Sequence, residues 1–207
     1  MTILGIRFEL KPTLVIIVGF LLPMIDLYHH NLTPVKAYDR FLLYFIVPAA
    51  IILIVFRDSL SDYGMRLGAW KEGIAWTIGA CIVMAVVIWY VGQRPEMVAY
   101  YKHRSSSGFG RALWLAGVDL FAWEFIWRGF TLFALSKYMG PGLAIWVQAI
   151  PFAFAHLGKP EIETLSTIFG GAGFGFVAWR SKSFFYPFLI HLFVTGWTIW
   201  VAMQAVQ

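Results

Sequence analysis

Five ionisable side chains lie within otherwise apolar stretches of this sequence: Asp119, Glu124, Arg128, His156 and His191. A carboxylate and an imidazole can together remove a proton from water, and a second imidazole or a guanidinium can stabilise the oxyanion that then develops. These residue types therefore favour a site for hydrolysis. A second interpretation is a structural network, in which Glu124 and Arg128 neutralise each other and the histidines bond to backbone carbonyls.

A metal site is a third interpretation of the same residues. Two histidines and one carboxylate could hold zinc. The His-Glu-x-x-His pattern of many zinc proteases is absent from the sequence, so this support is weak. We therefore expect no cofactor, with zinc as the open alternative.

The spacing of Glu124 and Arg128 indicates how the chain positions this chemistry. They lie four residues apart in D-L-F-A-W-E-F-I-W-R-G-F, residues 119–130, and on an α-helix this spacing stacks two side chains on one face. Charged groups at the centre of a membrane helix cost at least ~2.5–3.5 kcal/mol each on insertion scales, and by default they mark function.

The composition indicates a membrane protein. Of 207 residues, 60% are hydrophobic and 13% are charged, against about 45–50% and 25% in soluble domains. The net charge of +5 comes from basic residues in short loops, which is typical of membrane topology and gives no reason to expect a nucleic-acid partner. The sequence predicts an all-α, polytopic bundle that forms a single domain over residues 1–207.

The hydropathy pattern predicts about seven membrane spans. They are expected at about 13–28, 41–56, 74–91, 111–135, 143–157, 165–179 and 184–206. Polar or interfacial connectors are expected at 57–73 and 92–111, and the motif-bearing core at about 111–200. His156 falls near the end of the fifth span, so it can share a site with Glu124 only if that helix end lies deep in the bundle.

Two further groups of residues have simple structural interpretations. Asp26, His29 and His30 close the first span, where a metal site is conceivable but a solvated helix end is favoured, because adjacent histidines point to different faces of a helix. Gly171 and Gly175, four residues apart in the sixth span, indicate close helix packing rather than a phosphate loop.

Three short motifs resemble those of a known family, the CAAX protease and bacteriocin-processing family of intramembrane proteases, also called the Abi family. They are E-F-I-W-R-G-F at 124–130, F-A-F-A-H at 152–156, and Y-P-F-L-I-H, which ends at His191. The upstream segment S-D-Y-G-M-R-L-G-A-W-K is also similar. Three motifs in order on consecutive helices, over about residues 111–200, make the resemblance fairly specific.

This resemblance implies a helical intramembrane endopeptidase without a covalent intermediate, acting on a peptide or a lipidated protein. It implies that Glu124 and His156 activate water, that His191 helps to form the oxyanion site, and that Arg128 orients the glutamate or braces the helices. The bacterial members are linked to bacteriocin maturation or self-immunity. We therefore expect a multi-pass protein of a bacterial inner membrane.

The chain departs from the family pattern at two positions. The first motif usually has paired glutamates, and Trp123 replaces the first of them; the third motif usually has an asparagine where Thr195 lies. Three outcomes stay open: Glu124 serves as the base, Asp119 substitutes one turn earlier on that face, or hydrolysis is lost. The alternative function is therefore a non-catalytic membrane protein, acting as a binding or bacteriocin self-immunity factor. A small transporter is disfavoured, because no repeat relates the two halves of the chain.

Overall fold

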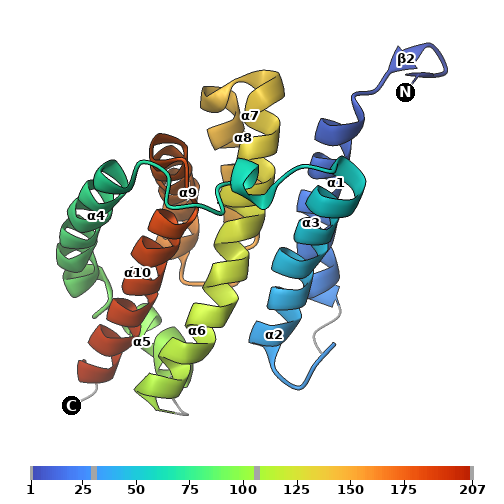
Figure 1. Cartoon of the computed structure of the whole chain (residues 1–207). Helices are drawn as coiled ribbons and strands as arrows, with labels where there is room; N and C mark the ends of the chain where they lie inside the picture. Colours follow the sequence, from blue (N-terminus) through green and yellow to red (C-terminus); the bar gives the residue numbers. More distant parts are fainter. Residues whose placement is uncertain (1, 29–31, 105–107, 206–207) are drawn as a thin grey trace.

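A computed structural model describes residues 2–28, 32–104 and 108–205, and these form an all-α bundle (Figure 1). The described chain begins with a small antiparallel hairpin of two-residue strands, β1 (Thr2–Ile3) and β2 (Ile6–Arg7). The hairpin extends beyond the helices at one end of the molecule, and the C-terminus lies at the opposite end (Figure 1).

The first two spans form a helical pair. The first is α1 (Leu10–Tyr28), and the second runs without a break from Lys36 to Phe56. The second contains four segments: α2 (Lys36–Phe41), the π-helical η1 (Leu42–Ile46), α3 (Val47–Ala50) and the π-helical η2 (Ile51–Phe56). Pro48 lies between the two π-helical segments. Because proline has no N–H to donate and its ring crowds the preceding turn, it disturbs the α-helical bonding pattern there.

The connector after the second span is anchored to the bundle instead of lying only on its surface. It contains the 3-10 helix η3 (Leu60–Tyr63), and Tyr63 is buried. The Tyr63 hydroxyl donates to Asp58, and Lys11 of α1 pairs with the same carboxylate at 2.8 Å. The hydrogen bond from Lys11 lowers the pKa of Asp58 below its ordinary value. The next span, α4 (Trp70–Val91), follows this connector.

The fourth span is one long helix that changes its winding at the candidate site. It consists of α6 (Phe109–Glu124), the π-helical η4 (Phe125–Thr131) and α7 (Leu132–Met139). The preceding connector forms the short helix α5 (Pro95–Arg104). All seven residues of η4 are buried, so this span forms the centre of the bundle. Single wide turns of this kind occur often at functional sites.

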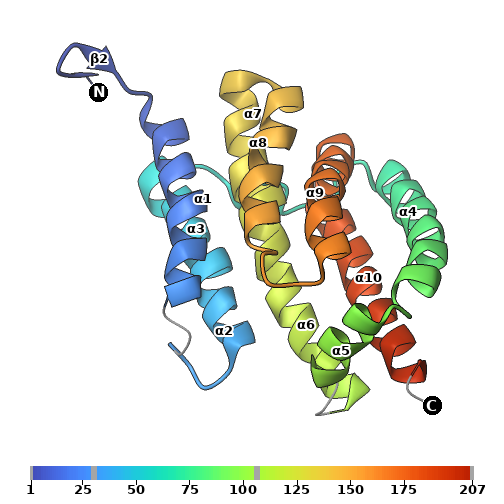
Figure 2. The ribbon, with the colours of Figure 1, turned by 180° about the vertical axis from the view of Figure 1, so that it is seen from behind.

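The last three helices complete the bundle. They are α8 (Pro141–Phe154), α9 (Glu161–Ser181) and α10 (Phe185–Gln204). The turn between α8 and α9 lies partway along α6 and α10 and not at an end of the bundle (Figure 2). Helix α8 ends at Phe154, so His156 lies in this turn and not in the helix expected at 143–157. Because α8 is short, its end and His156 lie within the bundle. This is the condition under which His156 was expected to share a site with Glu124.

Helix α9 begins earlier than the span expected at 165–179. It starts at Glu161 directly after Pro160, with Glu161 and Glu163 in its first turn. Acidic side chains are favourable at that end of a helix, because the first turn carries a partial positive charge. The two glutamates therefore belong to the helix and do not precede it.

All seven predicted spans correspond to helices in the structure. Four of these are long and apolar enough to cross a membrane by length and composition: Leu10–Tyr28, Lys36–Phe56, Trp70–Val91 and Phe185–Gln204; α8 is a shorter apolar helix. The protein is an all-α, polytopic membrane protein. The largest cluster of buried side chains surrounds η4 and α7, with Phe125 and Phe130 among its fully enclosed members.

Gly171 and Gly175 lie where α9 packs on α8, as their spacing predicted. A Cβ atom added at Gly171 would lie 2.8 Å from the Phe152 ring, and one added at Gly175 would lie 2.7 Å from Gln148 Nε2. These contacts are too close for a side chain. Gly171 therefore requires glycine for helix packing, whereas a side chain at Gly175 would displace the Gln148 amide.

Candidate functional site

Glu124, Arg128 and His191 form a buried cluster at the junction of α6 and η4 with α10. His191 Nδ1 lies 2.6 Å from Glu124 Oε1, and Arg128 Nη1 donates to the same oxygen at 3.1 Å. Glu124 and Arg128 are both 0% exposed. The predicted contact between Glu124 and Arg128 is therefore present, although the helix winds as a π-helix from Phe125 onward.

The contact with Glu124 determines that Nδ1 of His191 carries a hydrogen. An ionised carboxylate can only accept hydrogen bonds, so Nδ1 of His191 donates to Glu124. The other ring nitrogen, Nε2, is then left for the cavity that His191 lines. A buried carboxylate that holds an imidazole in this way orients the ring and stabilises its protonated form, in which Nε2 also carries a hydrogen.

Arg128 also connects this cluster to α9. Its Nη2 donates to the Gly171 carbonyl at 3.2 Å, and Gln148 of α8 donates to the same carbonyl at 2.9 Å. The guanidinium lies 3.9 Å from the centre of the Phe152 ring, a cation–π contact. Arg128 therefore joins three helices around Glu124.

His156 approaches from the opposite side, in the turn after α8. Its Nδ1 lies 2.8 Å from the Phe152 carbonyl oxygen, so Nδ1 donates there and Nε2 is the nitrogen left for another partner. The imidazole is 4% exposed, and its ring lies against Phe152 and Trp123. Within the described chain no hydrogen bond joins His156 to Glu124, although both were expected to act on one water.

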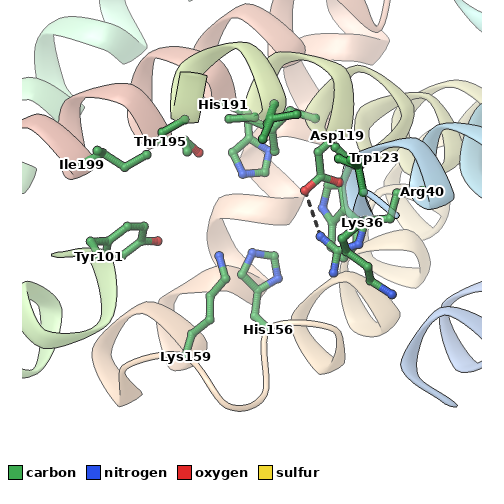
Figure 3. A pocket seen from close by; sticks show the side chains of 16 residues that line it. Lys36, Arg40, Tyr101, Asp119, Trp123, His156, Lys159, His191, Thr195 and Ile199 are labelled. Carbon is green, nitrogen blue, oxygen red and sulfur yellow. Dashed lines mark hydrogen bonds and ion pairs between the residues drawn. The ribbon is translucent and has the colours of Figure 1, made fainter. Parts of the chain in front are cut away.

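A cavity of about 270 Å³ brings the two histidines together. His191 and Thr195 line one side of it, and His156 and Lys159 line the opposite side (Figure 3). It is large enough for several waters, since each takes about 30 Å³ of liquid volume. Glu124 and Arg128 do not line this cavity.

A second charged group lies at the cavity wall and was not expected as a group. Arg40 of α2 donates from Nη1 to Asp119 Oδ2 at 2.9 Å and from Nε to Asp26 Oδ2 at 3.0 Å. Lys36 Nζ lies 2.5 Å from Asp26 Oδ1. Asp26 is 5% exposed, so the solvated helix end expected for it is wrong. The other two members of that expectation, His29 and His30, lie outside the described residues.

The sequence contained one signal for this group. Lys36 and Arg40 lie four residues apart at the start of an apolar span, where charged side chains need a partner. The pairing itself brings together residues 79 positions apart, Arg40 and Asp119, and no periodicity reveals such a contact.

The described residues contain no group of three or more His, Cys, Asp or Glu side chains placed to hold a metal ion. The zinc alternative therefore has no ligand set within residues 2–28, 32–104 and 108–205. The functional groups that these ranges place around the cavity are two imidazoles, one carboxylate, two hydroxyls, two amines, a guanidinium and an indole.

Comparison with known proteins supports the resemblance of the motif-bearing segment. A family model described as type II CAAX prenyl endopeptidase Rce1-like matches residues 105–197. No curated protein and no solved structure matches the chain. The matched segment contains Glu124, Arg128, His156 and His191, and it ends shortly after the third motif. Residues 105–197 are therefore similar to the Rce1-like type II CAAX prenyl endopeptidases.

Proposed function

We propose that this protein is an intramembrane endopeptidase that hydrolyses a peptide bond in a peptide or lipidated protein. The family is a family of proteases, which supports peptide hydrolysis in general terms. The single observation that carries the proposal is the 2.6 Å contact between His191 Nδ1 and Glu124 Oε1 at the wall of a cavity that His156 also lines.

The two imidazoles have complementary roles in this proposal. A water bound at His156 Nε2 attacks the carbonyl carbon of the substrate. His191, charged and stabilised by Glu124, donates from Nε2 to the carbonyl oxygen as it becomes an oxyanion. The C–N bond then breaks, the proton lost by the attacking water passes to the departing amine, and the new carboxylate takes its oxygen from water.

Glu124 and Arg128 act through other residues in this scheme. Because Glu124 does not line the cavity, its charge reaches the reaction through His191. Arg128 balances the buried carboxylate and fixes it against α9. We therefore propose Glu124 and Arg128 as positioning residues, and His156 and His191 as the groups that touch substrate or water.

The direct test is cleavage by purified protein in liposomes. Substrates would be identified by comparing the peptides of cells that contain or lack the protein, with a peptide ending in a prenylated cysteine and three further residues as the first probe. We expect cleavage by the wild type, and its loss in His156→Ala, His191→Ala and Glu124→Gln, each inserted and folded normally. Cleavage that is equal in all four proteins would overturn the proposal.

A second candidate function rests on Trp123. It lies where the family usually has the first glutamate of its pair, and it is 5% exposed against the cavity wall. Without a carboxylate at that position, the same fold could act as a membrane binding or bacteriocin self-immunity protein. In that case the wild type would bind the prenylated peptide in liposomes, and no product would form over long incubation.

A further inference from the structure

The cavity contains a carboxylate that differs from the motif glutamate. Among the described residues that line it, Asp119 is the only acidic one. Its side chain is 19% exposed, whereas the side chain of Glu124 is 0% exposed. Asp119 lies five residues before Glu124, which places it about 7.5 Å along the helix and about 140° around it. The two carboxylates therefore lie in different environments: Asp119 at the cavity and Glu124 in the interior of the bundle.

One oxygen of the Asp119 carboxylate accepts a hydrogen bond and the other does not. Arg40 Nη1 donates to Oδ2 at 2.9 Å (Figure 3), while Oδ1 has no hydrogen-bond partner among the described residues. An enclosed carboxylate oxygen without a partner costs free energy unless a donor reaches it. Because Oδ1 is enclosed, the exposed 19% of the side chain is the part that a water in the cavity can reach.

Trp123 lies next to the arginine that holds Asp119. Trp123 fills the first glutamate position of the motif, and Asp119 lies one helical turn earlier on the same face. The Trp123 ring contacts the Arg40 guanidinium, with 4.9 Å between the ring centre and Cζ. Trp123, which replaces the usual glutamate, therefore also contacts Arg40, and Arg40 holds Asp119.

We propose that Asp119 is the catalytic carboxylate of this chain, the group that takes the proton from the attacking water. The inference rests on the proposed endopeptidase function. Arg40 is then a positioning residue, since it acts through Asp119.

The proton balance of the step is complete without a further reactant. As the water oxygen bonds to the carbonyl carbon, one water proton passes to the Asp119 carboxylate. The carbonyl π electrons move to the oxygen, where His191 Nε2–H donates to it. When the carbonyl re-forms, the C–N bond breaks, and the proton on Asp119 moves to the departing nitrogen. The products are a carboxylic acid, which ionises, and an amine.

Asp26 offers a matched control, because it bonds to the same arginine. Asp26 lines a different pocket, between α1, α2 and α8, and does not line the cavity of the two histidines. Asp119→Asn and Asp26→Asn each remove one negative charge from Arg40, but only the first removes the carboxylate from the cavity. With the prenylated peptide as probe, we expect Asp119→Asn to lose about 100-fold or more in kcat, the scale of general base catalysis. Asp26→Asn should stay within a few-fold of the wild type.

A rescue experiment separates a chemical role from a structural one. Asp119→Ala removes the carboxylate and leaves space beside Arg40. Formate, added at high millimolar concentration, should restore part of the cleavage in Asp119→Ala and none in His191→Ala. Asp119→Glu should retain more activity than Asp119→Asn, because it keeps a carboxylate.

The outcomes distinguish this inference from the proposed function. If Asp119→Asn cleaves at the wild-type rate while His191→Ala is inactive, the function stands and the role of Asp119 is overturned. Equal losses in Asp119→Asn and Asp26→Asn, without rescue by formate, would make Asp119 structural and also overturn it. If the wild type forms no product, the proposed function fails and the inference fails with it.

Discussion

His191 Nδ1 and Glu124 Oε1 lie 2.6 Å apart, across 67 residues of sequence and between two helices. Arg128 donates to the same carboxylate oxygen from one turn further along the chain. The acid is completely enclosed, whereas the imidazole lines a cavity. This arrangement separates the buried charge from the cavity in which, on the proposed function, water and substrate meet.

Glu124→Gln should lower kcat by roughly 10²- to 10⁴-fold, the range for losing a group that sets the charge and tautomer of a catalytic histidine. Glutamine keeps the shape but loses the charge that stabilises a protonated His191. The measurement is steady-state cleavage of the prenylated peptide in liposomes. Substrate affinity should change little, since Glu124 does not line the cavity.

Glu163→Gln is the control for that variant. Glu163 is a carboxylate at the start of α9 that pairs with Lys159 and accepts a hydrogen bond from Tyr101. It makes no hydrogen bond to either cavity histidine within the described chain. A loss of kcat in Glu163→Gln as large as that in Glu124→Gln would mean that an acid outside the histidine contact matters equally, contrary to the proposed role of Glu124.

Arg128→Met should destabilise the protein by about 3–5 kcal/mol, because it leaves the enclosed Glu124 charge without its partner. Arg128→Lys should not restore full stability, since a single ammonium does not reproduce the fork that reaches Glu124 Oε1 and the Gly171 carbonyl. Thermal unfolding in detergent measures both changes.

The double variant Arg128→Met with Glu124→Gln is the internal check on this prediction. Removing both charges should recover part of the stability lost in Arg128→Met alone, as expected for two coupled groups. Strictly additive losses in the double variant would show that the ion pair does not account for the effect.

Gly171→Ala should lower both stability and cleavage. The added Cβ would lie 2.8 Å from Phe152, 3.3 Å from Ala149 and 3.4 Å from Arg128 Nη2, so α9 would move away from the residues that brace Glu124. The neighbouring Gly170 has nothing within 4 Å of an added Cβ. Gly170→Ala should therefore be neutral or slightly stabilising, because alanine favours a helix by about 1 kcal/mol over glycine. Equal effects of the two substitutions on the melting temperature would contradict the packing assigned to Gly171.

The pair between Lys11 and Asp58 predicts a pH-dependent contribution to stability. Its hydrogen bond lowers the pKa of Asp58 in the folded state, so the stabilisation is present at neutral pH and is lost as pH falls below the ordinary value of 3.8. Asp58→Asn should cost about 0.2–1 kcal/mol at pH 7, the range for partly exposed pairs.

Two melting curves test that sign. The difference in melting temperature between wild type and Asp58→Asn should shrink as the pH is lowered toward 3. Asp62→Asn, in the same connector, is the control for removing an acid outside this pair. A difference for Asp58→Asn that grows on acidification would contradict the assignment.

The spans and the contact between Glu124 and Arg128 could be predicted because their signals are local. Apolar runs of suitable length predict helices, and a spacing of four residues predicts the contact between Glu124 and Arg128. Gly171 and Gly175 likewise carry a packing signal that the structure confirms. Each of these features depends on residues within one helix or one turn of each other.

The remaining features depend on contacts between distant segments. The sequence placed His156 at a helix end, but it could not show that α8 stops partway into the bundle and brings the turn beside His191. The contact between Arg40 and Asp119 joins the second and fourth spans, and the enclosure of Glu124 depends on all the helices around η4. Such relationships follow from tertiary packing, which periodicity does not encode.

The most direct test of the central claim is cleavage of the prenylated peptide in ¹⁸O-labelled water by the wild type, His191→Ala and Thr198→Ala. Thr198 lies on the same helix, bonds to the Val194 carbonyl and does not line the cavity, so its variant is the control. The account predicts one ¹⁸O atom in the new carboxyl group, unchanged kcat in Thr198→Ala, and a loss of about 100-fold or more in His191→Ala. Cleavage by His191→Ala at the wild-type rate would contradict it.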